Sequence, residues 1–369
     1  MTTIKAKKAL TEVRPYKQGK SDIKGVVEPI KLSSNESPYP PSPKAVKAYQ
    51  RIERVLVIYP DGAQTELRSV LAKLHSIPKD NIFAGNGSEE AIGLIVRAVL
   101  EPGDEIIVSE NSFIMTEKYA RSVGAEVIKC GELDQRVDVD AMLAATCERT
   151  KIVYLCSPNN PTGTYTSAQE LKRLIARLPD NVLFLMEAAY AEFADAPDYS
   201  DGLSFFSPEG RVAVTRTFSK AYGLAGLRIG YAIAPNAVVD AVSRLRTPFN
   251  ANSAAMAAAT AAALDQKFLQ NNVSKVRATR EVFSSGLREL GLTVIPSQAN
   301  FVLINFESED DLAYDLDRAL QSMGILGRPA VAGAKNEYRI SIGSDEEMRK
   351  TLNVIREWLN DRRRDRQQH

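Results

Sequence analysis

Short apolar runs alternate with helical segments through the middle of the chain. The runs have strand length, and they are Ile82–Ala84, Glu105–Ser109, Glu126–Lys129, Ile152–Cys156, Val182–Met186 and Val212–Val214. Strands that are apolar at consecutive positions are typical of a parallel sheet with both faces covered. The segments between them, among them 44–54, 89–100 and 115–122, have a helical pattern. The pattern predicts an α/β fold in which helices sandwich a mainly parallel sheet.

The pattern changes at both ends of this region. Residues 1–30 are polar and lack periodicity, which predicts an extended N-terminal arm. After Pro248 we expect an Ala-rich helix over Ser253–Leu269. Two more strands are expected near Phe301–Ile304 and Tyr338–Ile342, and a last helix is expected to begin at Ser344, whose spacing to Glu347 fits a capping box.

Three regions follow from this pattern. They are an arm at 1–30, a large domain at 31–248 and a smaller α+β domain at 249–369. A chain of 369 residues is also too long for one small core.

Composition and charge narrow the range of functions. A formal net charge of +1 gives no strong field for nucleic acid or membranes, and no apolar run approaches a membrane span. The only histidines are His75 and His369, which argues against histidine triads and histidine-rich metal sites. The three cysteines lack metal-ligand spacing and are odd in number, so we expect the cytoplasm and no metal. The basic cluster Arg362–Arg364 with Arg366 is interpreted as a solvated tail.

The most informative motif follows the apolar run Val212–Val214. Thr217, Ser219 and Lys220 come in close succession, and Arg228 follows among glycines. A lysine amine can form a Schiff base with an aldehyde cofactor, and hydroxyl and guanidinium groups can bind its phosphate. Taken alone, Lys220 could also be a surface lysine at a turn.

Two further segments offer parts of a pyridoxal phosphate (PLP) site. Gly87, Ser88 and Glu89 open a helix, whose backbone N–H groups can hold an anion, although a turn with an N-cap explains them equally well. Asn160 lies in Ser157–Gly163, directly after a strand, where its amide can donate to a phenolate oxygen. The alternative for that segment is a proline-rich loop.

The next strand supplies a carboxylate and a phenol. Glu187 could pair with a protonated pyridine nitrogen, and Tyr190 could donate to the same phenolate oxygen as Asn160. Phe113 follows another strand and could stack on the ring, or it could be a core aromatic. Because open α/β sheets bind ligands at the carboxyl ends of their strands, we expect these residues to meet there.

Together these segments resemble fold-type I PLP enzymes, and within them the histidinol-phosphate aminotransferases. The resemblance is carried by Arg14–Tyr16 with Gly19–Lys20, Lys31–Pro38, Tyr59–Gly62, Ser157–Gly163, Thr215–Tyr231, Phe249–Asn252, Ser297–Phe301 and Tyr338–Ser341. It implies a PLP-dependent aminotransferase of histidine biosynthesis, with an amine donor and a 2-oxo acid acceptor.

The resemblance also assigns roles to single residues. Lys220 would hold PLP and move the proton, and Tyr59 would reach the cofactor phosphate of the neighbouring subunit, which implies a homodimer. Arg339, assisted by Arg328, would bind the acidic group of the substrate. The arm and the segment after it would add Tyr16 and Asn35 to the substrate site.

One residue departs from the family pattern. Glu187 stands where the family has aspartate, so the charge is kept on a side chain longer by one methylene. We expect the ion pair to be retained, with activity reduced or redirected. Aromatic amino-acid transamination and phosphothreonine decarboxylation use similar scaffolds and stay open as alternatives, as does a weakly catalytic PLP-binding sensor.

Overall fold

The computed structural model describes residues 4, 7–11, 13, 15–16, 18–306, 311–329 and 336–367. Arg14, the side chain of Arg366, and His369, which were named above, lie outside the described residues.

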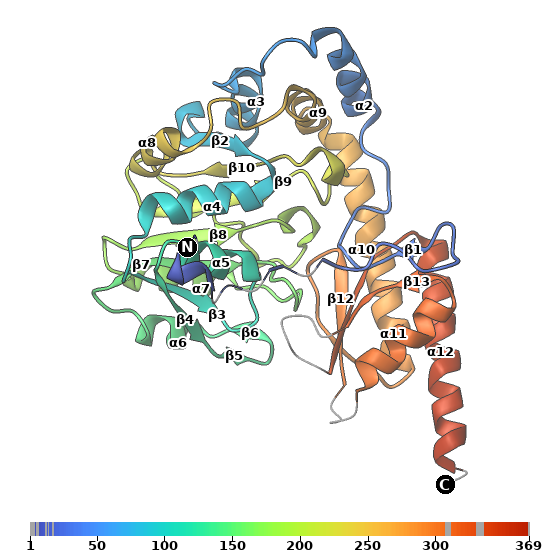
Figure 1. Cartoon of the computed structure of the whole chain (residues 1–369). Helices are drawn as coiled ribbons and strands as arrows, with labels where there is room; N and C mark the ends of the chain where they lie inside the picture. The colour runs from blue at the N-terminus through green and yellow to red at the C-terminus, as the bar shows by residue number, and fades with distance from the viewer. Residues whose placement is uncertain are drawn as a thin grey trace.

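Helices and strands alternate through most of the described chain (Figure 1). The helices are α1 (Lys8–Thr11), α2 (Pro43–Gln50), α3 (Thr65–His75), α4 (Gly87–Val99), α5 (Ile114–Ser122), α6 (Val139–Ala144), α7 (Ala168–Arg177), α8 (Asn236–Leu245), α9 (Ser253–Ala263), α10 (Gln266–Glu289), α11 (Leu312–Ser322) and α12 (Asp345–Gln367). The strands are β1 (Ile30–Lys31), β2 (Ile82–Gly85), β3 (Glu105–Ser109), β4 (Glu126–Cys130), β5 (Glu132–Leu133), β6 (Arg136–Val137), β7 (Thr150–Cys156), β8 (Leu183–Glu187), β9 (Val212–Thr217), β10 (Gly230–Ile233), β11 (Thr293–Ile295), β12 (Phe301–Asn305), β13 (Ile325–Leu326), β14 (Arg328–Pro329) and β15 (Glu337–Ser341).

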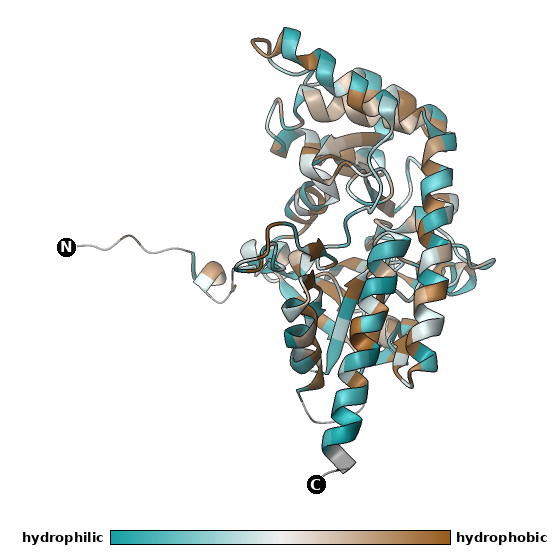
Figure 2. Cartoon of the chain, turned by 90° about the vertical axis from the view of Figure 1, so that its right-hand side faces the viewer, coloured by the Kyte–Doolittle hydropathy of each residue, from teal (hydrophilic) through white to brown (hydrophobic). Residues whose placement is uncertain are grey.

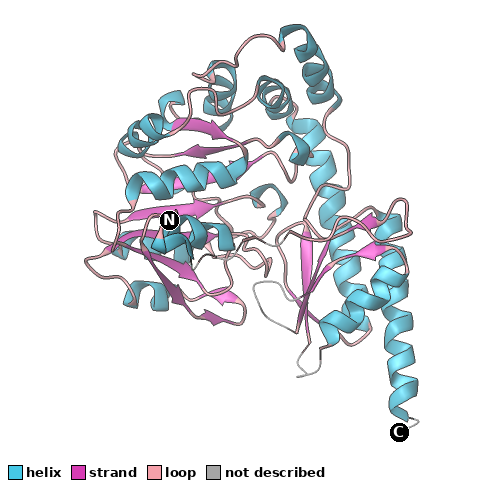
Figure 3. Ribbon diagram, viewed as in Figure 1, coloured by secondary structure: helices cyan, strands magenta, loops and turns pink. Residues whose placement is uncertain are grey.

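The larger sheet of the described chain has seven strands in the order β2-β10-β9-β8-β7-β3-β4 (Figure 3). Only β10 runs antiparallel to its neighbours; the pairs formed by β9, β8, β7, β3 and β4 are parallel. The predicted mainly parallel sheet is therefore confirmed.

Alternate residues of each strand point to opposite faces of this sheet. Tyr154 and Cys156 of β7 belong to a core that includes side chains of α4, α5 and α8. Val153 and Leu155, on the same strand, belong to the core formed with α6 and α7. Because both faces are covered, the strands contain apolar residues at consecutive positions.

A smaller antiparallel sheet, in the order β11-β12-β15-β14, packs against α10 and α11, and α12 packs against these two helices. β1 pairs in parallel with β13 and so ties the N-terminal part of the chain to this unit. The predicted capping box is confirmed, since Ser344 N donates to Glu347 Oε2 at 2.7 Å and Glu347 N donates to Ser344 Oγ at 3.3 Å.

Two expectations about helices were wrong. The arm is not wholly extended, because Lys8–Thr11 forms one helical turn that packs against α5. The single helix expected over Ser253–Leu269 is broken at Leu264 and Asp265. Asp265 accepts hydrogen bonds from Ser42 Oγ at 2.5 Å and Lys44 Nζ at 3.0 Å, so this long-range contact at the start of α2 replaces helix continuation.

The division into domains at residues 30 and 248 stays a prediction. α9, which that division places in the smaller domain, packs against α2 and α3. Figure 2 shows α12 on the outside of the molecule with a mostly hydrophilic surface. No helix among the described residues is long and apolar enough to cross a membrane.

Candidate active site

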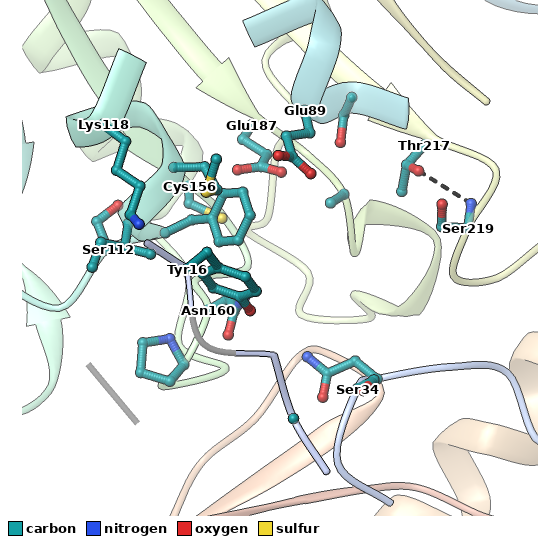
Figure 4. Close-up of a pocket in the computed structure, with 18 of the residues that line it drawn as sticks. Tyr16, Ser34, Glu89, Ser112, Lys118, Cys156, Asn160, Glu187, Thr217 and Ser219 are labelled. Carbon is teal, nitrogen blue, oxygen red and sulfur yellow. Dashed lines mark hydrogen bonds between the residues drawn. The ribbon is translucent and has the colours of Figure 1, made fainter. Parts of the chain in front are cut away.

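A cavity of about 870 Å³ lies between the carboxyl ends of the large-sheet strands and the smaller sheet (Figure 4). It brings together fourteen of the residues predicted from the sequence, contributed by segments far apart in the chain. They are Tyr16, Asn35, Ser88, Glu89, Phe113, Asn160, Glu187, Tyr190, Thr217, Ser219, Lys220, Arg228, Arg328 and Arg339. Gly87 and Tyr59 do not line it.

Lys220 lies in the turn that follows β9. Its Nζ donates to the carbonyl oxygen of Ser34 at 3.0 Å. Burial, and then the positive charges of Arg339 and Arg228, lower the pKa of Lys220 to about 8, while Glu36 and Glu187 act in the opposite direction. About a tenth of this amine is therefore neutral, and so nucleophilic, at pH 7, far more than at the ordinary pKa of 10.5.

Arg228, Ser219 and Thr217 form a compact group of donors beside the start of α4. Arg228 Nη1 donates to Ser219 Oγ at 3.2 Å, and Ser219 N donates to Thr217 Oγ1 at 3.1 Å. Arg228 Nη2 is 3.5 Å from the carbonyl oxygen of Asn86, the residue before α4. A guanidinium, two hydroxyls and the amide groups of a helix N-terminus are a donor set suited to a phosphate.

Gly87 shapes this group without lining the cavity. Its φ is +81°, and a Cβ added there would lie 2.5 Å from Arg228 Nη2. Glycine is required at this position both by the backbone angle and by the close approach of the arginine. Gly87 thus contributes a left-handed backbone and the free space that lets Arg228 lie close to the start of α4.

Glu187 is the last residue of β8, and its side chain is buried. Its Oε2 accepts a hydrogen bond from the hydroxyl of Tyr154 on β7. Burial raises the pKa of Glu187, whereas the Tyr154 hydrogen bond and the charge of Lys220 lower it. In Figure 4 the side chain of Glu187 points into the same part of the cavity as Glu89. A buried carboxylate next to a cavity is suited to a cationic partner.

Asn160 is held by Arg339 of β15. Arg339 Nη1 donates to Asn160 Oδ1 at 2.6 Å, and Nη2 donates to the carbonyl oxygen of Ser33 at 2.9 Å. Because arginine can only donate, the amide oxygen of Asn160 must face it. The amide NH₂ is then left to donate elsewhere.

Tyr190 and Asn35 connect the large sheet with the smaller one. Asn35 Nδ2 donates to the Tyr190 hydroxyl at 3.0 Å, and Asn35 Oδ1 accepts from Ser341 Oγ at 3.0 Å. Lys220 Nζ is 5.9 Å from the centre of the Tyr190 ring. Burial raises the pKa of Tyr190, so its hydroxyl keeps its proton and can donate it in a hydrogen bond.

Arg328 and Arg339 are direct partners across the antiparallel pair β14–β15. Both line the cavity. Burial lowers the pKa of Arg339, and so does the charge of Arg328. Like charges directly opposite each other are unfavourable in a sheet, so an anion bound between them would be stabilising.

The remaining predicted residues lie at the edge of the cavity or outside it. Phe113 precedes α5, and Tyr16 is half exposed, with Lys118 Nζ 5.9 Å from its ring centre. Tyr59 is 79% exposed and stacks on Phe249 with ring centroids 4.8 Å apart, away from the cavity of its own chain.

Sequence reasoning missed Tyr154, Lys118 and Arg121. Lys118 and Arg121 line the cavity from α5, and Tyr154 reaches it only through Glu187. A tyrosine inside an otherwise apolar buried strand was a usable signal, because its hydroxyl must find a partner. Among the residues that the structure describes, no group of three or more His, Cys, Asp or Glu could hold a metal ion.

Comparisons with known proteins agree with this arrangement. Residues 27–355 match the family model described as aminotransferase class I and II. The chain is 41% identical to a histidinol-phosphate aminotransferase of Maricaulis maris over 95% of this chain and 98% of that protein. It is 39% identical to one from Rhodospirillum centenum over 95% of this chain and 97% of that protein.

Two solved structures that are similar to this chain are also named as histidinol-phosphate aminotransferases. Histidinol-phosphate aminotransferase from Sinorhizobium meliloti, in complex with pyridoxal 5'-phosphate, matches with a TM-score of 0.89 and 27% identity, over 98% of this chain and 99% of that one. A putative histidinol-phosphate aminotransferase from Erwinia carotovora matches with a TM-score of 0.85 and 28% identity, over 94% and 99% of the two chains. The predicted family and fold class are therefore confirmed. This chain belongs to the class I and II aminotransferase family.

Proposed function

We propose that this protein is a PLP-dependent aminotransferase that takes histidinol phosphate as its amine donor and 2-oxoglutarate as acceptor, in histidine biosynthesis. The observation that carries the proposal is the arginine pair Arg328–Arg339, placed directly across two strands in the cavity that contains Lys220. The relatives at 38–41% identity are named for this activity, and the solved relative from S. meliloti binds PLP.

The residues present fit PLP. The donors around Arg228 suit its phosphate, and the space beside Gly87 is one that a Cβ would fill. The buried carboxylate of Glu187 suits a protonated pyridine nitrogen, and Asn160 and Tyr190 can donate to the phenolate oxygen. We propose that Glu89 contributes its backbone N–H at the start of α4, because its carboxylate would repel a phosphate.

PLP, when bound, supplies an aldehyde that condenses with amines and a ring that accepts electron density from the substrate's Cα. Lys220 would hold the aldehyde and, once released, would take the proton from Cα and return it to the cofactor carbon. Its lowered pKa suits this work, since a neutral amine is needed both to attack and to accept a proton. Glu187 would keep positive charge on the ring nitrogen, and Phe113 would limit ring motion by stacking.

Arg339 and Arg328 are proposed to bind the phosphate of the donor or a carboxylate of the acceptor. Both substrates are anionic, so one cationic pair can serve each half-reaction in turn. Tyr16 and Asn35 complete the substrate side of the cavity.

We further propose a homodimer with shared active sites. The described stretch that contains Val57, Ile58 and Tyr59 presents consecutive large apolar side chains to solvent, which is typical of a protein interface. Tyr59 would cross this interface to the phosphate group held by the partner subunit. The three cysteines are free, and we propose the reducing cytoplasm as the compartment.

Single-turnover spectroscopy tests the substrate assignment. The PLP-loaded protein is mixed with histidinol phosphate, phenylalanine, tyrosine or phosphothreonine, and the loss of visible cofactor absorbance is followed. The proposal expects the fastest loss with histidinol phosphate and recovery on adding 2-oxoglutarate. A preference for phenylalanine or tyrosine would favour an aromatic aminotransferase instead. Release of CO₂ from phosphothreonine would favour a decarboxylase, and spectral binding without turnover would favour a weakly catalytic sensor.

A further inference from the structure

We infer that Tyr154 is a positioning residue for Glu187: its hydroxyl fixes the carboxylate and keeps the negative charge on it beside the pyridine nitrogen of PLP. The inference rests on the proposed function, because it takes Glu187 to be the partner of that nitrogen.

The two side chains come from neighbouring parallel strands. Tyr154 pairs in register with Leu185, two residues before Glu187, so Tyr154 and Glu187 are diagonal neighbours on one face of the sheet. Diagonal neighbours are within reach of long side chains. Tyr154 is completely buried, and its hydroxyl donates to Glu187 Oε2.

The contact between Tyr154 and Glu187 depends on the length of the glutamate side chain. An aspartate on the same backbone would end about 1.5 Å short of the glutamate carboxylate, which is the length of one carbon–carbon bond. The tyrosine hydroxyl meets the carboxylate of the longer side chain. The departure at Glu187 is therefore accompanied by a donor that holds the longer side chain in place.

The charge of Glu187 depends on the groups around it. Tyr154 and Cys156 face it from β7, Lys220 from the turn after β9, Glu89 from α4, and Tyr190 lies beyond the end of its own strand. Burial and Glu89 raise its pKa; the hydrogen bond from Tyr154, the largest of the opposing effects, lowers it. In a buried pair the proton goes to the stronger base. Without this donor the carboxylate would compete more strongly for the proton of the ring nitrogen, because only the weaker effects of Lys220 and Ser88 would remain to lower its pKa.

The test is nitrogen-15 NMR of ring-labelled PLP bound to the full chain, which reports directly whether the ring nitrogen is protonated. We expect a protonated nitrogen in the unchanged protein and a resonance moved toward the unprotonated position in Tyr154→Phe. Losing a hydrogen bond to a charged group should raise the pKa of the Glu187 carboxyl and slow proton abstraction by about 10- to 100-fold.

Tyr231→Phe is the matched control. Tyr231 is also buried, but its hydroxyl bonds His75 Nε2 at 2.7 Å, so removing it should leave the nitrogen resonance unchanged. If Tyr154→Phe does not fold, Tyr154→Met, which also removes the hydroxyl from this buried position, should move the resonance in the same direction.

The double variant separates this role from packing. After Glu187→Asp, adding Tyr154→Phe should change the rate of proton abstraction by no more than about twofold, since the contact is already lost. A protonated nitrogen in a folded Tyr154→Phe or Tyr154→Met variant, or an equal rate loss in both backgrounds, would overturn the inference and leave the proposed function standing. A chain that binds no PLP would instead overturn the proposed function.

Discussion

Arg339 donates to Asn160 Oδ1 at 2.6 Å and so joins β15 of the smaller sheet to the loop after β7 of the larger one. One residue thereby orients a proposed cofactor ligand and lines the proposed anion site. Binding of an anionic substrate at Arg339 would therefore affect the position of the amide that we propose to face the cofactor.

We expect Arg339→Ala to raise the Michaelis constant for histidinol phosphate by about 10- to 100-fold, the equivalent of one or two charge-assisted hydrogen bonds. Arg328→Ala should have a smaller effect in the same direction, and the absorbance of bound PLP should persist in both. Arg244→Ala, on an exposed arginine that pairs with Asp240 of the same helix, is the control. Unchanged Michaelis constants in both cavity variants would remove this pair from the substrate site.

The lowered pKa of Lys220 predicts a pH dependence. In the cofactor-free chain, the rate of covalent PLP attachment should rise with pH and level off above about 8, instead of continuing to rise toward the ordinary value of 10.5. Stopped-flow absorbance measures this rate. A rate that keeps rising well beyond that point would show that the surroundings do not lower the pKa of this lysine.

The same shift affects stability with a definite sign. Between pH values of about 8 and 10.5 the unfolded chain binds more protons at Lys220 than the folded one, so this residue makes the cofactor-free protein more stable as pH rises through that window. Below the window both states are protonated, and its contribution no longer changes.

Gly87→Ala should weaken PLP binding by about tenfold or more, because a left-handed backbone costs a residue with a Cβ roughly 1–2 kcal/mol, and the methyl group would also displace Arg228. Gly226→Ala is the control, since nothing lies within 4 Å of a Cβ there. Equilibrium dialysis of PLP against both variants gives the comparison. Equal affinities would separate Gly87 from the phosphate site.

Mixing Tyr59→Ala with Lys220→Ala should restore activity that neither variant has alone. Each mixed dimer would contain one site with an intact Lys220 and the partner subunit's intact Tyr59, so random exchange should recover about one quarter of the original activity. Mixing Lys220→Ala with Lys118→Ala, whose change is on the same cavity as Lys220, provides a reference. No recovery despite verified subunit exchange would contradict a shared site.

Much of the site could be predicted because the side chains suited to cofactor chemistry lie at positions where the sequence predicts that a strand ends. Asn160, Glu187 and Lys220 each lie at or just after the end of a strand, and a parallel sheet gathers such ends at one edge. The family resemblance added the arginines, which neither spacing nor periodicity would have joined.

The features that could not be predicted from the sequence depend on contacts between segments that are far apart in the chain. The cross-strand pairing of Arg328 with Arg339 depends on the register of two strands, and the break before α10 depends on Asp265 reaching Ser42. In the sequence, Tyr154 is one position of the apolar run Ile152–Cys156 and carries no sign of a partner. Only the placement of β7 beside β8 reveals the carboxylate that its hydroxyl meets.

The account depends above all on Lys220 as the residue that holds the cofactor. Borohydride reduction of the PLP-loaded protein, followed by peptide mapping, tests this directly, with Lys118 as the second lysine on the same cavity. The account predicts the reduced cofactor on the peptide that contains Lys220, and none on that peptide after Lys220→Ala. Label on Lys118 or on any other lysine of the unchanged protein would contradict it.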